Sequence, residues 1–372
     1  SSAASDVYKW QPEGFVEEQI ATGLDPTTMT LAPDGRIFIA EKKGQILIVR
    51  DGEVLPDPFL VLTLDNSNER GLSGIALDPN FEENNYVYVY YTVLGVSHNR
   101  VSRFTANDDL AIPGSEKVLL EIDPLSGSIH NAGAMEFGAD GTLYISTGEG
   151  AQPTNSQDMN TLLGKILRIN SDGSIPEDNP FYNELEGKYR AIWASGFRNP
   201  FSMAIEHSTG RIFSCDVGSF LYEEVNAVEK GKNYGWSILE GPRTDEEVPE
   251  NYQDPFYSYH HGIGCSVIGA AFYSPENKTF PEKYHDKFFF GDYCKGYIKV
   301  LNPQSGEVEE TFATGVNRPL NFMVTPEGDF YYLERAGLGG GSEVDNTASS
   351  NGALWKISYT GNGAPFISVQ PQ

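Results

Sequence analysis

His130 is the side chain in this sequence whose type and surroundings best suit proton transfer. It stands in the run His130-Asn131-Ala132-Gly133, where small neighbours let another group approach the imidazole ring closely. A neutral imidazole, with an ordinary pKa of about 6.5, can take a proton near neutral pH. The plainer alternative is a loop histidine bonded to a backbone carbonyl. The strand-turn-strand unit that follows this run recurs along the chain, whereas the histidine occurs in one copy alone, and this difference favours a functional role.

Further polar and charged residues stand in loops that show no packing pattern. Arg198, in the loop Gly196-Phe197-Arg198-Asn199-Pro200, has no packing role there, although a surface or inter-strand ion pair is the alternative. The stretch from Gly218 to Tyr234 combines small residues with the acidic pair Glu223-Glu224. Calcium binds backbone carbonyls and carboxylates, so this loop predicts a calcium site, with a solvated acidic edge as the alternative. Other loop candidates are Glu69, Asn199, His260 to Ser266, Lys295 and Arg318.

The elements that must position these residues are diverged repeats. Each repeat is a strand, a turn containing glycine, proline or asparagine, and a second strand ending in an aromatic residue or isoleucine. The turns lie near residues 34, 78, 140, 209, 275 and 327, so successive repeats are 44 to 69 residues apart. That spacing fits one four-stranded blade plus variable loops. The sequence therefore predicts an all-β fold, a six-bladed β-propeller of four-stranded antiparallel blades, in preference to unrelated hairpins in a sandwich.

A propeller explains how distant loops could share one site, because its inner strands all end at one face and their loops converge over the central channel. We expect a single propeller domain over residues 1–360 and a tail or linker over residues 361–372. The lone strand predicted at residues 15–20 would complete the last blade and close the ring. Helical periodicity is weak, with one short helix or turn expected within residues 155–167.

Charge and hydropathy exclude several classes of partner. The chain has 372 residues, of which 52 are acidic and 26 basic, giving a net charge of −26. This charge argues against binding nucleic acid or an anionic membrane surface. No apolar run approaches the roughly 20 residues of a membrane helix, so no membrane span is expected. The small residues Ser1 to Ser5 could be the remainder of a cleaved signal peptide.

The three cysteines allow at most one intramolecular disulfide. Cys265 precedes the fifth repeat and Cys294 follows one of its strands, so we predict that these two pair and leave Cys215 as a buried, inert thiol. A bond across this separation should stabilise the protein by about 3 kcal/mol. A disulfide also predicts an oxidising compartment, periplasmic or secreted.

Several motifs, in this order, resemble the soluble glucose/sorbosone dehydrogenase family, aldose sugar dehydrogenases that use pyrroloquinoline quinone (PQQ) on a six-bladed propeller. The resemblance covers Gly23 to about Tyr359. It rests on Glu69-Arg70-Gly71-Leu72-Ser73-Gly74, Asp78-Pro79-Asn80-Phe81, His130-Asn131-Ala132-Gly133, Gly164-Lys165-Ile166-Leu167-Arg168-Ile169, Gly196-Phe197-Arg198-Asn199-Pro200, Asp216-Val217-Gly218, Glu223-Glu224-Val225-Asn226 and Asn233-Tyr234-Gly235-Trp236.

The resemblance implies roles for matching residues. His130 would be the general base, and Arg198 and Asn199 would contact the quinone and the substrate side of the pocket. Lys295 and Arg318 would hold the carboxylates of PQQ, and Ser266 would offer it a hydroxyl. The carbonyls of Gly218 and Ser219 would ligate a calcium ion (Ca2+) under the cofactor, and Glu224 and Tyr234 a second, structural calcium.

Three positions depart from the family pattern. Leu320 stands where some members carry a second cofactor-binding arginine, and Ala132 replaces a usual glycine. Glu69 falls where well-studied sugar oxidisers have a glutamine near the substrate, so it would place a negative charge there unless Arg70 neutralises it.

The resemblance favours a PQQ- and calcium-dependent oxidoreductase that acts on a sugar or related alcohol and passes electrons to an external acceptor, as a monomer or homodimer. One alternative is a propeller that has lost the cofactor and binds a glycan or a protein. Another is a metal-dependent hydrolase such as a lactonase. A hydrolase would need inward acidic ligands around a channel calcium, whereas the candidate loops supply His, Arg, Asn and Lys.

Overall fold

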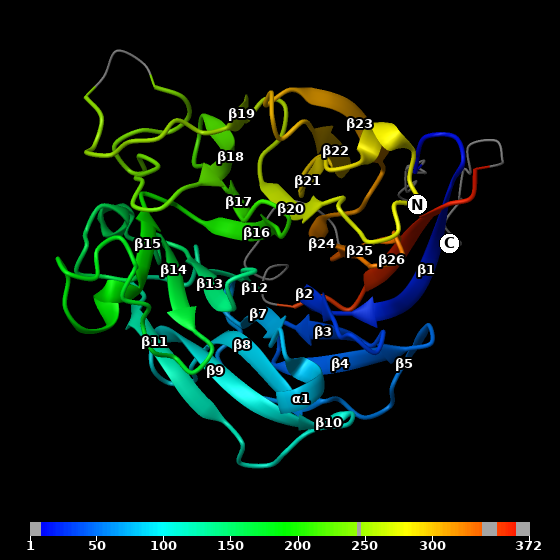
Figure 1. Cartoon of the computed structure of the whole chain (residues 1–372), viewed down its shortest axis with the longest axis horizontal. Coiled ribbons are helices and arrows are strands. Elements are labelled where there is room, and N and C mark those ends of the chain that lie inside the picture. The colour runs from blue at the N-terminus through cyan, green and yellow to red at the C-terminus, as the bar shows by residue number, and fades with distance from the viewer. Residues whose placement is uncertain (1–8, 244–246, 337–347, 362–372) are drawn as a thin grey trace, which may run out of the picture.

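A computed structural model describes residues 9–243, 247–336 and 348–361. Six antiparallel sheets stand around a central axis, and the chain visits them in order, as Figure 1 shows from blue to red. The predicted six-bladed β-propeller is therefore confirmed. The expected signal-peptide remainder at residues 1–5 lies outside the described residues, as does the expected tail beyond residue 361.

Strands of one blade are consecutive in the sequence, except in the last. The first blade contains β2 (Pro26–Leu31), β3 (Ile37–Glu41), β4 (Gln45–Arg50), β5 (Glu53–Val54) and β6 (Leu60–Val61). The second contains β7 (Leu72–Leu77), β8 (Tyr86–Thr92), β9 (His98–Asn107), β10 (Leu110–Ala111) and β11 (Lys117–Pro124). The third contains β12 (Ala132–Phe137), β13 (Thr142–Thr147), β14 (Lys165–Asn170) and β15 (Ile192–Ser195).

The remaining three blades each contain four strands. The fourth contains β16 (Pro200–Glu206), β17 (Arg211–Asp216), β18 (Tyr222–Val228) and β19 (Tyr257–His260). The fifth contains β20 (Val267–Phe272), β21 (Phe288–Asp292), β22 (Tyr297–Leu301) and β23 (Val308–Thr314). The sixth contains β24 (Pro319–Val324), β25 (Phe330–Glu334), β26 (Gly352–Tyr359) and β1 (Phe15–Leu24).

The sixth blade joins the two ends of the described chain. Strand β1 pairs antiparallel with β26, and Phe15 lies opposite Tyr359. The lone strand predicted at residues 15–20 is thus confirmed in place and in role, and extends to Leu24. Because β1 pairs with β26, the last described strand of the chain, the ring closes without an open seam between its first and last blades.

The first strands of the blades form the inner wall. Neighbours around this ring, β2, β7, β12, β16, β20 and β24, contact one another in a closed cycle. Short turns lead from these strands to the next. For example, Gly141 has φ 75°, and the Asp140 carboxylate accepts the Thr142 N–H at 3.1 Å, so the Asp-Gly pair sets this turn.

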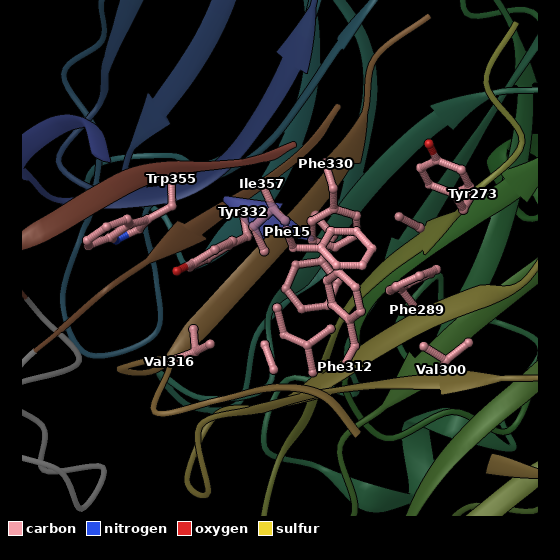
Figure 2. Packing of buried hydrophobic residues seen from close by; sticks show 14 of the residues in the cluster. Phe15, Tyr273, Phe289, Val300, Phe312, Val316, Phe330, Tyr332, Trp355 and Ile357 are labelled. Carbon is pink, nitrogen blue, oxygen red and sulfur yellow. The ribbon is translucent and has the colours of Figure 1, made fainter. Parts of the chain in front are cut away.

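Aromatic side chains fill the spaces between blades. Phe15 is 2% exposed and lies edge-on to Phe280 at 4.7 Å and to Phe312 at 5.1 Å between ring centroids. Figure 2 shows this packing, with Phe330 and Phe289 in the same cluster. Full burial of one such side chain stabilises the fold by about 1.5–3 kcal/mol, so these layers replace a single large core.

Helices are few and short among the described residues. They are α1 (Phe81–Asn84) and the 3-10 turns η1 (Pro153–Ser156), η2 (Gly187–Ala191) and η3 (Glu282–Tyr284). Of the helix or turn expected within residues 155–167, only the end of η1 is present, and Lys165 begins β14. No helix in the described ranges has the length and apolar character needed to cross a bilayer.

Candidate active site

The loops that enter the inner strands carry most of the predicted site residues. Glu69 and Arg70 lie two to three residues before β7, and the other residues stand directly before an inner strand: His130 and Asn131 at β12, Arg198 and Asn199 at β16, Ser266 at β20, and Arg318 at β24. Because the inner strands form one ring and begin at the same end of the channel, these residues gather around one mouth.

A recurring position at the end of the second strand holds these loops in place. It is occupied by Glu41, Thr92, Thr147, Asp216, Asp292 and Glu334. In the fourth blade, Asp216 accepts the N–H of Arg198 at 2.9 Å and that of Asn199 at 2.6 Å. Burial raises the pKa of Asp216 to about 6, although these two N–H groups lower it. Sequence reasoning missed this position, whose signal was an acid or threonine closing the second strand of every repeat.

His130 is held by two carboxylates. Its N–H donates to Glu69 Oε2 at 2.6 Å, and its ring Nδ1 contacts Glu149 Oε1. Glu149 is 1% exposed, and its other carboxylate oxygen has no hydrogen-bond partner among the described residues. Nor does any described residue bond Nε2 of His130. Glu149 was not predicted, although it follows the third repeat's second strand by two residues.

The sequence left open whether the neighbouring Arg70 neutralises Glu69, and in the structure Arg70 does not pair with it. Arg70 pairs with Asp65 at 2.7 Å and also donates to the carbonyl of Gly127 at 3.1 Å. Glu69 instead accepts the N–H of His130, which has the left-handed φ of 58°. Its negative charge therefore lies against the His130 backbone, and its contact is one that a glutamine oxygen could also make.

Arg198 and Asn199 link the third and fourth blades. The Glu149 N–H donates to the Arg198 carbonyl at 2.9 Å, and Asn199 Oδ1 accepts the Ala132 N–H at 3.1 Å. The Arg198 guanidinium donates to the carbonyls of Val217 at 2.9 Å and Gly218 at 2.6 Å. Its Nε is buried without a partner among the described residues. Glu149 thus connects the two predicted residues: its carboxylate contacts the ring of His130, the predicted base, and its N–H donates to the carbonyl of Arg198, the arginine predicted to contact the quinone.

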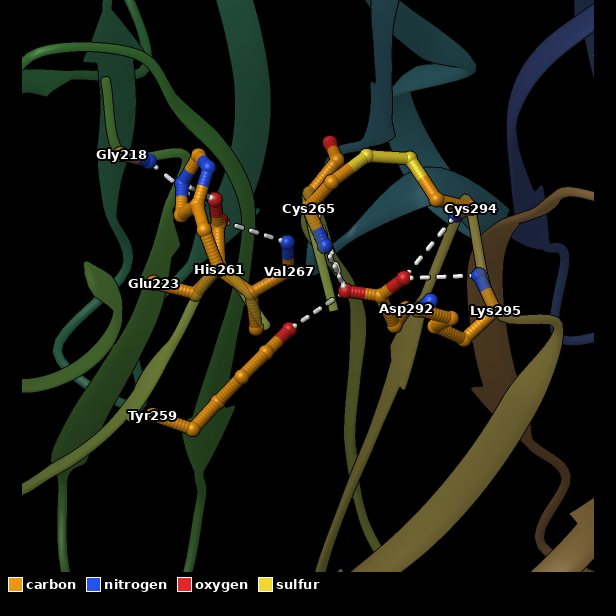
Figure 3. Close-up of a disulfide and its surroundings, with 10 residues drawn as sticks. Gly218, Glu223, Tyr259, His261, Cys265, Val267, Asp292, Cys294 and Lys295 are labelled. Atoms are coloured by element: carbon orange, nitrogen blue, oxygen red, sulfur yellow. Dashed lines mark hydrogen bonds and ion pairs between the residues drawn. A yellow bond between two sulfur atoms is a disulfide. The ribbon is translucent and has the colours of Figure 1, made fainter. Parts of the chain in front are cut away.

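The predicted disulfide between Cys265 and Cys294 is present, with 5.8 Å between the Cα atoms. Ser266 and Lys295 each follow one of its cysteines. Figure 3 shows the disulfide with Lys295 next to Cys294. The buried Asp292 carboxylate accepts the N–H groups of Cys265, Ser266, Cys294 and Lys295 at 2.8–3.1 Å. The Lys295 side chain is exposed. Cys215 is free and buried, as expected, and burial raises the pKa of its thiol.

Arg318 is buried at the start of the sixth blade. Its φ is 60°, its guanidinium lies 5.3 Å from the ring centroid of Tyr293, and Nη1 donates to the Ala336 carbonyl at 3.4 Å. Leu320 is also buried and packs with Ile268 and Leu333 in a hydrophobic cluster. At this position the chain has core packing where some family members carry the second arginine.

The predicted calcium loop adopts a sharp turn at Gly218. A Cβ there would lie 1.6 Å from the carbonyl oxygen of Tyr222, so only glycine fits. One carboxylate oxygen of Glu240 accepts four consecutive N–H groups, those of Ser219 at 2.7 Å, Phe220 at 2.8 Å, Leu221 at 3.0 Å and Tyr222 at 3.3 Å. Glu240 was not predicted from the sequence.

The acidic pair on β18 is buried rather than solvated. Glu223 Oε1 lies 2.6 Å from His261 Nε2, and Oε2 accepts the N–H of Val267 at 2.8 Å and of Gly218 at 3.3 Å (Figure 3). Burial raises the pKa of Glu223 to about 8. The solvated-edge alternative is therefore wrong.

Glu224 and Tyr234, the predicted ligands of a second calcium, have protein partners. Glu224 accepts the Gly241 N–H at 2.7 Å and Asn226 Nδ2 at 3.2 Å, and burial raises its pKa to about 8. The Tyr234 hydroxyl donates to the Ala227 carbonyl. Within the described residues, no group of three or more His, Cys, Asp or Glu side chains surrounds a metal-sized space. A calcium site here would depend on backbone carbonyls.

The residues at the mouth fit an anionic cofactor with several carboxylates. The loops bring one cation from each of three blades, Arg198, Lys295 and Arg318, to the same end of the channel. The unpartnered Arg198 Nε and the exposed Lys295 ammonium leave donors for a bound anion. The carbonyl of Gly218 faces the Arg198 guanidinium, so it lies on the same side.

Comparisons with known proteins show the family and the fold of this chain. A family model for glucose/sorbosone dehydrogenases matches residues 24–339. An aldose sugar dehydrogenase of Escherichia coli is 26% identical over 351 residues, covering 86% of this chain and 88% of that protein. A solved structure of the soluble aldose sugar dehydrogenase from Escherichia coli in the apo form is 25% identical, with a TM-score of 0.80, and covers 93% of this chain and 99% of the other.

Two further relatives match a smaller part of this chain and differ in kind. Quinoprotein glucose dehydrogenase B of Acinetobacter calcoaceticus is 28% identical over 279 residues, which cover 65% of this chain and 56% of that protein. The human Hedgehog-interacting protein is 29% identical over 227 residues, covering 52% of this chain and 32% of that protein. Chains similar to this one therefore include sugar dehydrogenases and a protein named for an interaction.

Proposed function

The chain belongs to the glucose/sorbosone dehydrogenase family, and from this premise we propose that it is a PQQ- and calcium-dependent sugar dehydrogenase. It would oxidise the hydroxyl of an aldose, or of a related alcohol, and convert the sugar to its lactone. The observation that carries this proposal is the His130–Glu149 pair, which the Glu149 N–H joins to the Arg198 backbone at the channel mouth.

His130 would be the general base. Since Nδ1 contacts Glu149, Nε2 is the nitrogen that can take the proton of the substrate hydroxyl. Glu149 would fix the tautomer that carries the hydrogen on Nδ1 and stabilise the imidazolium that forms. When bound, PQQ supplies a quinone that accepts the hydride from the carbon bearing that hydroxyl.

The remaining mouth residues would bind and orient. Lys295 and Arg318 would hold the PQQ carboxylates as charge-assisted pairs, and Ser266 and Asn199 would hydrogen-bond the cofactor. Arg198 would stabilise negative charge on the quinone oxygens. Glu69 would stand near the substrate. The Gly218 and Ser219 carbonyls would ligate one calcium, and Glu224 and Tyr234 a structural one.

Reconstitution tests the proposal directly. Apo protein is mixed with PQQ and calcium, the quinone absorbance is followed, and dye reduction is measured with a panel of aldoses. We expect PQQ-dependent stabilisation and turnover of at least one sugar. Chelating calcium should lower the melting temperature, because a ligand of the folded state stabilises it by mass action. The proposed enzyme activity is refuted if the protein, in excess PQQ and calcium, neither binds PQQ nor oxidises any aldose.

The second candidate is a cofactor-free propeller that binds a glycan or protein partner. Leu320 favours it, because its buried side chain replaces a cofactor-binding cation of some family members. The two candidates differ in one result, since the binding module shows no PQQ-dependent absorbance change or stabilisation.

We place the protein in an oxidising compartment, the periplasm or the cell exterior, because the Cys265–Cys294 disulfide would persist there. Electrons would leave through an external acceptor. We expect a monomer or homodimer.

A further inference from the structure

Glu240 holds the loop that carries the two predicted calcium-ligating carbonyls. It lies outside the loop in sequence, and its carboxylate Oε1 accepts the N–H groups of the four consecutive residues 219–222. One acceptor atom therefore sets the orientation of four successive peptide groups. The loop has no regular secondary structure before β18 begins at Tyr222, so these bonds replace the strand pairing that it lacks.

The direction of these bonds decides where the carbonyls face. In a trans peptide the carbonyl of one residue and the N–H of the next point in opposite directions. Because the Ser219 N–H points to Glu240, the Gly218 carbonyl must point away from it, and it is found 2.6 Å from Arg198 Nη1. The Phe220 N–H also points to Glu240, so the Ser219 carbonyl likewise points away from Glu240.

The carboxylate charge adds a second effect. An anion that accepts a peptide N–H polarises the peptide and makes its carbonyl oxygen more negative. Both carbonyls therefore become better ligands for a hard cation.

We propose that Glu240 is a positioning residue for the calcium site under the cofactor, because it turns the Gly218 carbonyl toward Arg198 and the Ser219 carbonyl away from its own carboxylate. This inference rests on the proposed function. Glu240 would touch neither calcium nor PQQ; it acts through the peptides of residues 218–220. Loss of such an outer partner typically weakens metal binding about 10- to 100-fold.

The test compares Glu240→Ala and Glu240→Gln with the wild type and with Glu250→Ala, which removes one exposed carboxylate from a nearby loop. Calcium affinity is measured from the calcium-dependent rise in melting temperature, and PQQ affinity from absorbance at fixed calcium. We expect calcium binding about 10- to 100-fold weaker in Glu240→Ala. Glu240→Gln keeps an acceptor oxygen without the charge and should be intermediate, whereas Glu250→Ala should match the wild type.

Amide hydrogen exchange of the apo proteins separates this inference from the proposed function. In Glu240→Ala the amides of residues 219–222 should exchange faster, with little change in the rest of the fourth blade. If Glu240→Ala does not fold, Glu240→Gln decides the question by the same two measurements. Unchanged exchange, or wild-type calcium affinity in a protein that does bind calcium, overturns the role of Glu240. If the wild type binds neither calcium nor PQQ, the proposed function is wrong. Faster exchange of amides 219–222 in Glu240→Ala would then still support Glu240 as the residue that holds this loop.

Discussion

At His130 two carboxylates fix the backbone and one ring nitrogen, and the other ring nitrogen has no hydrogen-bond partner among the described residues. Glu69 accepts the His130 N–H and Glu149 contacts Nδ1, so the ring is oriented by carboxylates from two blades. Mutations at these positions should therefore separate proton transfer from cofactor binding, since none of the contacts involves the cations that would hold PQQ.

Replacing the base tests this separation. His130→Ala should bind PQQ as the wild type does and lose about 10²–10⁴ in kcat, the usual contribution of a general base. The control is His207→Ala, which removes an exposed imidazole in the turn between β16 and β17, far from His130 in the sequence. PQQ titration and steady-state kinetics check both values. Equal loss of kcat in the two variants would exclude His130 as the base.

Glu149→Gln keeps the size of the side chain and removes its charge. We expect a lower kcat, by a smaller factor than in His130→Ala, because the imidazolium loses its stabilising anion. KM and PQQ affinity should stay near the wild-type values. A kcat equal to that of the wild type would show that the pair only orients the ring.

Lys295 is a suitable probe of cofactor binding, because its exposed side chain contributes little to packing. Lys295→Ala should weaken PQQ binding about tenfold, the equivalent of one charge-assisted hydrogen bond, and leave the melting temperature of the apo protein unchanged. The matched control is Lys283→Ala, an exposed lysine on η3. If both variants bind PQQ equally well, Lys295 has no role in holding it.

Among the elements, the fifth-blade disulfide connects two site residues as well as two strands. Cys265 and Cys294 stand immediately before Ser266 and Lys295, and Asp292 holds the N–H groups of all four. The disulfide and the carboxylate together fix the distance between the backbone at Ser266 and the backbone at Lys295.

Reduction of this disulfide should affect stability and binding together. The paired variant Cys265→Ser/Cys294→Ser should unfold at about 3 kcal/mol lower free energy than the wild type. It should also bind PQQ more weakly, because Ser266 and Lys295 are less constrained. Urea unfolding and PQQ titration measure these changes. Under denaturing, non-reducing conditions one free thiol, Cys215, should be titrated, and three would contradict the bond.

The sequence predicted the strands and blades better than it predicted the carboxylate side chains that hold the loops in place. Alternating strands and Gly-containing turns are local signals, so the blades, the strand at residues 15–20 and the cysteine pair could be anticipated. Asp292 belongs to the recurring acid or threonine that closes the second strand of each repeat, so the sequence did contain its signal. Glu149 and Glu240 could not be anticipated, because each acts on groups that only the folded ring brings to it, the His130 imidazole in one case and four backbone N–H groups in the other. The same reason explains Arg70, whose partner proved to be Asp65 instead of its neighbour Glu69.

For the whole molecule, the position of Phe15 makes ring closure measurable. Phe15 packs into the aromatic cluster of the last two blades, whereas Val16, on the opposite face of β1, is 39% exposed. Phe15→Ala should lower the free energy of unfolding by about 3–5 kcal/mol. Val16→Ala should change it by less than about 0.5 kcal/mol. Urea denaturation compares them, and similar losses would mean that β1 adds little to the ring.

The pairing of β1 with β26 also has a consequence during biosynthesis. The ribosome releases β1 before the other described strands, but its partner β26 emerges after all of them. Until then the nascent chain exposes the unpaired edges of β1 and β25, which can pair with other chains. A stalled chain that ends before β26 should thus be digested by protease at both of these edges, while its middle blades resist. Closure of the ring therefore cannot precede the release of β26.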